Sequence, residues 1–355
     1  MSNSNVRKVL SNTIYQTLGR VVSAGETLLA TALITRALGP VGYGEITLIV
    51  TYTTMFFVMA DFGINSIVVR EWAGSKDKAQ SELPSLFLLR FGISVVLSLI
   101  AGTIAFLAWG RLPGYNQTVV TGILISLVLI FGQGVYFTCS AVFQSFSSYA
   151  KAFWASLWGN AVALALVVMA LKIAPNVLGL TLALVVGSLV PSLIAWYYVR
   201  DFINFGQLKV NTNFCKKLLI ASFPTGVGLV INTIYTSSDR LLLSVLSTTA
   251  MLGFYGLAYK IFENVLVLPN FFMNAVFPVL VQHKKESGAR LNQTIQKTFD
   301  ALSLAVFPLV VGGGVLSTAF ILIIGGDGFA TAASGLLLLF LGVVVYFYSL
   351  YLDGL

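Results

Sequence analysis

Residues 177–199 read VLGLTLALVVGSLVPSLIAWYYV, an apolar run of 23 residues without a charged side chain. A helix needs about 20 mostly apolar residues to cross the hydrocarbon core of a bilayer. The whole chain has the same character, because 57% of its 355 residues are hydrophobic and only 10% are charged. Soluble domains carry roughly 25% charged residues. The run therefore predicts a membrane-spanning helix, and the composition predicts that most of the chain lies in a membrane.

Similar apolar stretches recur along the chain, separated by short polar connectors such as Leu38-Gly39-Pro40. Alternating patterns of the kind seen in membrane β-strands are absent. The predicted fold class is therefore all-α, a polytopic membrane helical bundle with about ten spans. The predicted spans are residues 12–35, 46–69, 83–108, 118–142, 153–171, 177–199, 218–246, 254–281, 299–324 and 332–352.

Basic residues collect on one side of the predicted membrane. If the amino terminus is inside, only three of the 21 Lys and Arg residues lie in outward connectors, and four lie within spans. The other 14 lie in the cytoplasmic segments, an asymmetry that sets orientation in membrane proteins. We therefore predict a multi-pass protein of the cell (cytoplasmic) membrane with a cytoplasmic amino terminus. This asymmetry also explains the net charge of +8 without a nucleic-acid partner.

Residues for metal, nucleotide or covalent chemistry are few. Cys139 and Cys215 each lack a nearby second cysteine, and the single histidine, His283, sits beside two lysines. No Gly-Lys pair occurs, so there is no phosphate-binding Walker A loop. The outward connectors are short and offer little besides Glu45 and Asp327 for acid–base catalysis. We expect no metal, no cofactor and no enzymatic activity.

Charged residues inside spans each cost about 2.5–3.5 kcal/mol at the bilayer centre, so they should face a cavity or one another. Eight such residues occur: Arg20, Glu26, Asp61, Arg90, Asp239, Arg240, Lys260 and Glu263. Structural ion pairs that hold helices together are expected in two places: Asp61 with Arg90, and Asp239 and Arg240 with Lys260 and Glu263.

A functional role is favoured for Arg20. Its one candidate acidic partner, Asp61, is also claimed by Arg90, which leaves spare positive charge in the inner half of the first six spans. A guanidinium group suits a diphosphate, which accepts paired charge-assisted hydrogen bonds. We predict that Arg20, with Arg90 assisting, binds a diphosphate from the cytoplasmic side. Glu26 and Asp61 are candidates for ion coupling.

The two groups of spans resemble each other. Both begin with a basic pair and reach a Tyr-Gly pair after one long helix, with an offset of about 209 to 212 residues, or six spans. The matching segments are Arg7-Lys8-Val9-Leu10 with Lys216-Lys217-Leu218-Leu219, Gly19 with Gly228, and Tyr43-Gly44 with Tyr255-Gly256. Transporters commonly place their substrate site between two such halves. We predict an N-terminal lobe of six spans over residues 1–200 and an incomplete C-terminal lobe over residues 201–355.

Short motifs in a particular order then resemble the Wzx-type oligosaccharide (polysaccharide) flippases, in the superfamily that also holds multidrug exporters and the lipid II flippase. The motifs are Ala37-Leu38-Gly39-Pro40-Val41-Gly42-Tyr43-Gly44, Asp61-Phe62-Gly63-Ile64, Ser222-Phe223-Pro224, Asp239-Arg240, Ala258-Tyr259-Lys260 and Val276-Phe277-Pro278. By that resemblance a complete protein has twelve to fourteen spans. The chain is therefore interpreted as a fragment or a naturally shortened form.

The resemblance implies a flippase that moves a polyprenyl-diphosphate-linked oligosaccharide across the cytoplasmic membrane by alternating access, for surface polysaccharide biosynthesis. It also implies that spans one, two, seven and eight line the cavity. Polar residues on these spans are candidates for sugar contacts, although polar helix contacts explain them equally well: Tyr15, Asn65, Asn232 and Tyr235. The implied partners are the lipid-linked oligosaccharide, membrane lipids and glycan-assembly proteins.

Three other functions remain open at this point. A drug/cation antiporter of the same fold would favour net negative charge in its cavity, but the eight buried charges sum to zero. A membrane glycosyltransferase or polymerase is disfavoured by the short outward connectors. A non-transporting scaffold for glycan assembly is compatible with a shortened chain. Neighbouring genes for glycosyltransferases would favour the sugar flippase over the drug exporter.

Overall fold

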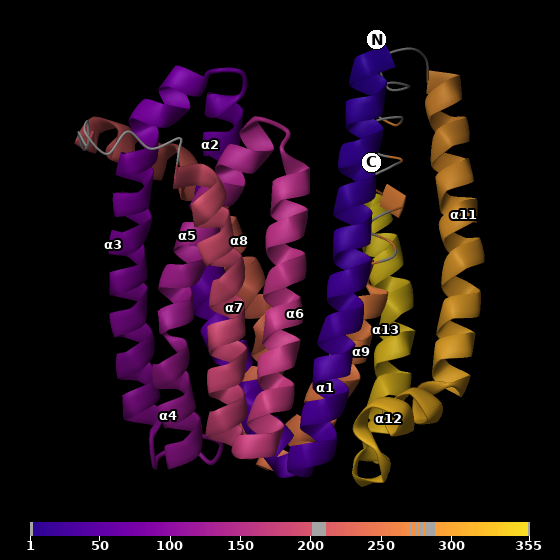
Figure 1. The fold of residues 1–355 in the computed structure, drawn as a ribbon. Coiled ribbons are helices and arrows are strands. Elements are labelled where there is room, and N and C mark those ends of the chain that lie inside the picture. Colours follow the sequence, from indigo (N-terminus) through magenta and orange to yellow (C-terminus); the bar gives the residue numbers. More distant parts are fainter. Residues whose placement is uncertain are drawn as a thin grey trace. The chain divides into compact units, whose positions relative to one another are not determined.

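The computed structural model describes residues 3–200, 211–267 and 288–353, together with residues 269, 272, 273, 276 and 280. The side chains of residues 3–17, 288–291 and 353 lie outside this description. Every regular element within these ranges is a helix (Figure 1). Eight helical segments there are long and apolar enough to cross a membrane. The predicted all-α membrane bundle is thus confirmed.

The chain divides into two compact units, Met1–Leu252 and Gly253–Leu355. The first contains α1 (Asn3–Met59), α2 (Ile64–Trp72), α3 (Lys76–Ala108), α4 (Gln117–Ser126), α5 (Val128–Ser145), α6 (Tyr149–Ile173), α7 (Val177–Val199) and α8 (Thr212–Leu246). The second contains most of α9 (Thr249–Val265), followed by α11 (Gly288–Val315), α12 (Ser317–Gly325), a 3-10 turn (Asp327–Phe329) and α13 (Ala332–Asp353). The division falls after α8. The lobes inferred from the repeat, 1–200 and 201–355, stay a prediction.

Helix α1 contains the first predicted span and most of the second, joined by a sharp kink instead of a loop. Gly39 has φ 63° and ψ −173° at the kink, and Pro40 follows it. Glycine adopts a positive φ without steric cost, whereas other residues do not. Proline is well suited to the first position of a helix, where no amide hydrogen is needed. The Gly-Pro pair therefore reverses the chain within a single residue.

The predicted continuous span 46–69 is wrong, because the helix ends at Met59 and a new one begins at Ile64. Phe62 and Gly63 between them have φ values of 46° and 69°. The turn packs tightly on α8, since a Cβ on Gly63 would lie 2.5 Å from Oγ1 of Thr225. Leu127 and Leu316, neither with a positive φ, separate α4 from α5 and α11 from α12 within the predicted spans 118–142 and 299–324. Gln117–Ser145 still forms one candidate membrane span.

Small residues allow α6 and α7 to pack closely along their length. A Cβ on Gly187 of α7 would lie 2.5 Å from Cα of Ala163 on α6, and a Cβ on Gly159 of α6 would lie 2.5 Å from Cδ of Pro191 on α7. Each helix thus presents two small or compact residues four positions apart. Small-xxx-small patterns of this kind let membrane helices approach until their backbones touch.

We expect the substitution Gly187→Ala to destabilise the protein, because the added methyl group meets the backbone of Ala163. Overpacking typically costs about 1–3 kcal/mol. The melting temperature of the purified protein in detergent, followed by a thiol-reactive or tryptophan fluorescence signal, measures the effect. Gly92→Ala on α3 is the matched control, since a Cβ there meets nothing within 4 Å. Equal melting temperatures for the two variants would contradict the close packing.

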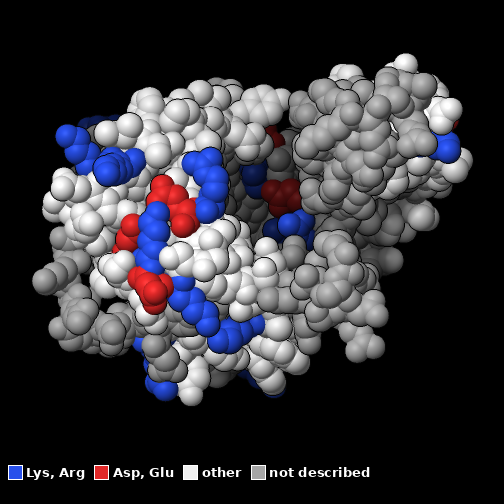
Figure 2. Space-filling model, turned by 90° about the horizontal axis from the view of Figure 1, so that it is seen from above, with Lys and Arg blue, Asp and Glu red and all other residues white. Residues whose placement is uncertain are grey.

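Charged side chains gather at one end of the first unit, over α2 and the start of α3 (Figure 2). Lys78 and Glu71 form an exposed ion pair of 2.8 Å. Beneath them the indole of Trp72, fully buried, donates a hydrogen bond of 2.8 Å to Glu82. Lys78 is among the basic residues that the sequence assigns to the cytoplasmic side.

The second unit is held by contacts of α13 with α11 and by aromatic packing around Phe329. The ring of Phe340 on α13 fills the space where a Cβ on Gly313 of α11 would lie. Ser303 on α11 shares a hydrogen bond of 2.8 Å with Tyr348 on α13. Phe329 is 1% exposed and meets Phe254 edge-on at 5.9 Å.

Candidate functional site

An ion pair lies buried in the membrane-spanning part of the first unit. Asp61, in the turn between α1 and α2, accepts a hydrogen bond of 2.8 Å from Nη2 of Arg90 on α3. The two side chains are 14% and 1% exposed. The backbone amide of Asn65 also donates to Asp61, at 3.3 Å. The turn at Phe62 and Gly63 is what places the carboxylate beside α3, and the expected pairing of Asp61 with Arg90 is present.

The guanidinium of Arg90 is only partly satisfied. Its Nε and Nη1 are buried without a hydrogen-bond partner among the described residues. Its Cζ atom lies 5.7 Å from the ring centroid of Phe137, within the range of a cation–π contact. Unpaired donors in an apolar environment carry a desolvation penalty. This region can therefore accept an additional ligand oxygen.

Neutral polar residues on α5 continue the hydrogen-bond network that begins at the ion pair of Asp61 and Arg90. Asn65 Nδ2 lies 3.5 Å from Oε1 of Gln144, and Nε2 of Gln144 donates to Ser140 Oγ at 3.0 Å. The Oδ1 atom of Asn65 has no partner among the described residues. Asn65 is a site residue predicted from the sequence, whereas Gln144 and Ser140 are not. Their spacing of four residues on one face of an apolar helix was the available signal.

A second polar cluster joins α1 to α6. Asn160 on α6 donates to Ser23 Oγ at 2.7 Å and also hydrogen-bonds Glu26. The other carboxylate oxygen of Glu26 is buried without a described partner. Glu26 is an ion-coupling candidate predicted from the sequence, whereas Asn160, a lone amide in an apolar span, is not. This cluster has the oxygen atoms that a proton or a small cation would require.

The structure places the other predicted substrate-binding residues on α1 and α8. Arg20 is exposed on α1, next to Gly19, whose neighbour on α6 is Phe153. The side chain of Tyr15 lies outside the described residues. Asn232 is exposed on α8, and Tyr235 is 77% exposed on the same helix.

The charges expected to join α8 to α9 form ion pairs within each helix. Asp239 and Arg240 on α8 approach to 3.7 Å, and Lys260 and Glu263 on α9 approach to 3.5 Å at i, i+3 spacing. The second helix belongs largely to the second unit. Pairing between the two helices stays a prediction.

Solved transporter structures share this fold. A multidrug resistance MATE family transporter of the MOP superfamily, in an inward-facing conformation, aligns with a TM-score of 0.72 at 15% identity, over 94% of this chain and 84% of that one. Lipid II flippase MurJ in an inward closed conformation aligns with a TM-score of 0.73 at 17% identity, over 97% and 75% of the two chains. At these identities the likeness shows the fold alone.

Sequence comparison gives the family. No curated protein matches the chain closely enough to count as a relative. The sequence model of the family described as "Polysaccharide biosynthesis protein" matches residues 9–284, well over half of the chain and the whole of both polar clusters. With the fold of the MATE and MurJ transporters and the motifs found in its sequence, this match shows that the chain belongs to the polysaccharide biosynthesis protein family.

Proposed function

We propose that this protein is a flippase that moves a polyprenyl-diphosphate-linked oligosaccharide across the cell membrane, with its amino terminus in the cytoplasm. The supporting observation is the family match over residues 9–284, which contains both polar clusters of the first unit. A transporter of this fold needs no catalytic group, and the proposal assigns no enzymatic activity to the protein. The product would serve surface polysaccharide biosynthesis, in company with glycan-assembly proteins.

Physical chemistry sets the task. A sugar hydroxyl without a hydrogen-bond partner costs about 4–8 kcal/mol in pure hydrocarbon, so an oligosaccharide cannot cross a bilayer unaided. A polar cavity between helices supplies water and side-chain partners, while the polyprenyl tail stays in the lipid. Alternating access of the repeat-related lobes, residues 1–200 and 201–355, would then expose that cavity to each side in turn.

Arg20 is the proposed ligand of the diphosphate, because it is an exposed guanidinium on a membrane-spanning helix. Arg90 is a weaker candidate than the sequence suggested, since its Nη2 donates to Asp61 and its side chain is 1% exposed. Its assistance to Arg20 stays a prediction. Glu26 is the proposed ion-coupling carboxylate, because Asp61 is already paired.

Sugar contacts are proposed for the polar residues that the sequence singled out on the first, second and seventh spans. Asn232 and Tyr235 are exposed on α8 and can present an amide and a phenol to a glycan. Asn65 has an unpartnered carbonyl oxygen, which would accept from a hydroxyl group. The same proposal covers Tyr15 on the first span.

Transport in liposomes tests the function. We expect the purified protein to expose a short polyprenyl-diphosphate oligosaccharide to a membrane-impermeant glycosidase added outside, at a rate well above that of empty liposomes. Vesicles with an imposed proton gradient, a sodium gradient or neither identify the coupling ion. A rate that ignores both gradients removes Glu26 from its proposed role and leaves the flippase proposal standing.

A drug exporter is the second candidate, favoured by the fold shared with the MATE family transporter. It predicts uptake of a hydrophobic cationic dye by the same liposomes under an ion gradient. Dye transport without exposure of the glycolipid would overturn the flippase proposal. Exposure of the glycolipid without dye transport would exclude the exporter.

A further inference from the structure

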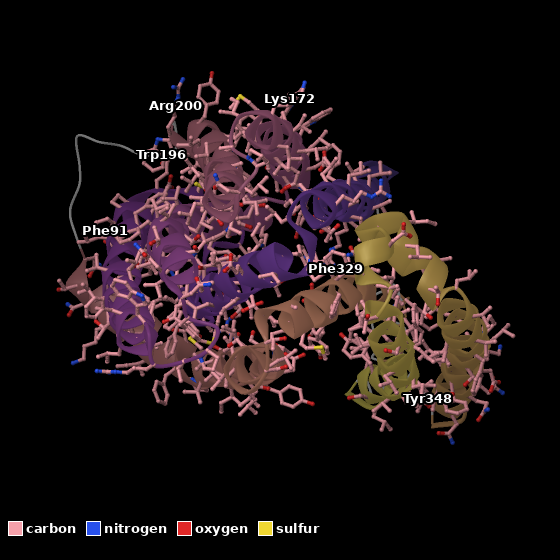
Figure 3. All side chains as sticks on the ribbon, turned by 90° about the horizontal axis from the view of Figure 1, so that it is seen from below. Phe91, Lys172, Trp196, Arg200, Phe329 and Tyr348 are labelled. Atoms are coloured by element: carbon pink, nitrogen blue, oxygen red, sulfur yellow. The ribbon has the colours of Figure 1, made fainter. Side chains whose placement is uncertain are left out.

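A groove of about 740 Å³ lies between α3, α5 and α7 on the outer surface of the first unit. Its lining is almost wholly apolar, and several of its side chains are among the exposed hydrophobic residues of the molecule. Leu88, Phe91 and Leu193 are 51%, 59% and 65% exposed. Figure 3 shows Phe91 and Trp196 at the outer edge of the helices. The volume is within the usual range for small-molecule sites.

The groove covers about half of the predicted membrane thickness. All three helices belong to segments long and apolar enough to cross a bilayer. On α3 the lining runs from Pro84 to Ser94, which is roughly 15 Å of helix at 1.5 Å per residue, or half of the ~30 Å hydrocarbon core. Its shallow end is marked by Trp196, near the end of α7. Tryptophan is enriched at membrane–water interfaces.

Two buried polar side chains line the groove and lack partners. Ser192 is 4% exposed, and its Oγ has no hydrogen-bond partner among the described residues. Arg90 is 1% exposed and leaves Nε and Nη1 unpaired. In hydrocarbon no water can satisfy these donors. The groove therefore suits a molecule that combines a hydrocarbon chain with acceptor oxygens, which a plain acyl chain of the bulk lipid does not provide.

A positively charged side chain lies near the end of the groove that Trp196 marks. Arg200 follows α7 directly, one helical turn after Trp196, and is exposed. Its guanidinium lies 4.1 Å from the ring centroid of Tyr197, which fixes its position. Figure 3 shows the labelled Trp196 and Arg200 near each other at the outer edge of the molecule. Basic sites between membrane helices on the cytoplasmic side attract acidic lipid headgroups.

We propose that this groove binds one acidic phospholipid of the predicted cytoplasmic leaflet. One acyl chain lies along α3, α5 and α7, lipid oxygens accept hydrogen bonds from Ser192 and Arg90, and the phosphate lies near Arg200. Apart from Arg90, whose assistance to Arg20 stays a prediction, the groove contains no residue proposed to contact the oligosaccharide. It does not depend on which substrate the protein transports.

Native mass spectrometry tests the site. The protein is extracted in a mild detergent with equal amounts of phosphatidylglycerol and phosphatidylethanolamine. We expect the wild-type protein to retain one phosphatidylglycerol molecule. The substitution Leu193→Trp fills the groove from its exposed side and should reduce retention to background. Leu182→Trp is the matched control, because Leu182 is a 52% exposed leucine on the same helix that does not line the groove.

The headgroup is tested separately. Arg200→Gln should lower the preference for phosphatidylglycerol over phosphatidylethanolamine by about five-fold, the contribution of one basic residue near an acidic membrane surface. Lys172 lies in the last turn of α6, which leads to the start of α7, whereas Arg200 follows the end of α7. The substitution Lys172→Gln should therefore leave that preference unchanged. Retention that is equal in the Leu193→Trp and Leu182→Trp variants would overturn the site. An unchanged preference in Arg200→Gln would overturn the acidic headgroup.

Discussion

Asp61→Ala is expected to lower the stability of the protein by about 3–5 kcal/mol, the effect of removing one partner from a buried ion pair. The carboxylate accepts a 2.8 Å hydrogen bond from Arg90, whose other two donor nitrogens already lack partners. Without Asp61 the whole guanidinium would remain buried in the membrane uncompensated. Chemical or thermal unfolding in detergent, monitored by fluorescence of the buried Trp72 environment, measures the loss.

The exposed pair of Lys78 and Glu71 provides the matched control, because its nitrogen–oxygen distance is also 2.8 Å. Glu71→Ala should change stability by less than about 1 kcal/mol, since exposed ion pairs contribute little. The double variant Asp61→Asn with Arg90→Met should regain most of the stability lost in Asp61→Ala, because no unpaired charge stays buried. Similar losses for Asp61→Ala and Glu71→Ala would show that burial does not govern the pair.

Arg20→Ala is expected to reduce flipping of the lipid-linked oligosaccharide by roughly ten-fold to one-hundred-fold, at unchanged protein abundance. This loss corresponds to one hydrogen bond to a charged group, about 1.5–3 kcal/mol, out of the two that a guanidinium can offer to a diphosphate. The liposome assay with the membrane-impermeant glycosidase gives the rate. Because Arg20 is exposed on α1, we expect its removal to leave the folded protein intact.

Two variants make the result specific. Arg20→Lys keeps the charge but loses paired hydrogen bonding, so it should retain part of the rate. Arg36→Ala removes another exposed arginine from α1, near the opposite end of the first predicted span, and should behave like wild type. Normal transport by Arg20→Ala would remove Arg20 from the substrate site while leaving the function of the family untouched.

Much of the fold could be predicted because hydrocarbon imposes a simple length requirement. The predicted span 177–199 coincides with α7, and the predicted span 332–352 differs from α13 by one residue. Breaks inside apolar stretches could not be predicted in the same way. Residues 46–69 were predicted as one span because hydropathy carries no information about backbone conformation. The positive φ of Phe62 accompanies the packing of its ring against Gly226 on α8, which is distant in sequence.

The charged residues of the candidate site could be predicted from the sequence, whereas most of its neutral polar residues could not. Asp61 and Arg90 were paired from sequence because a charge in the membrane needs an opposite partner. Asn160, Gln144 and Ser192 are neutral residues in apolar helices, and such residues usually bond to their own helix. Asn160 faces a carboxylate because α6 packs on α1, and Gln144 faces an amide because α5 packs on α2. Ser192 faces an open groove because α7 lies beside α3 and α5.

The kink at Gly39 also determines where the protein tolerates added sequence. The first two spans are joined with no spare residues, since Gly39 alone reverses the chain before Pro40. An epitope tag or reporter enzyme inserted there would separate two helices that the kink holds together. The connection between α6 and α7, where Pro175 and Asn176 are exposed, has the accessibility that insertions require. Experiments that map membrane sidedness should therefore place the reporter for the predicted outer side between α6 and α7.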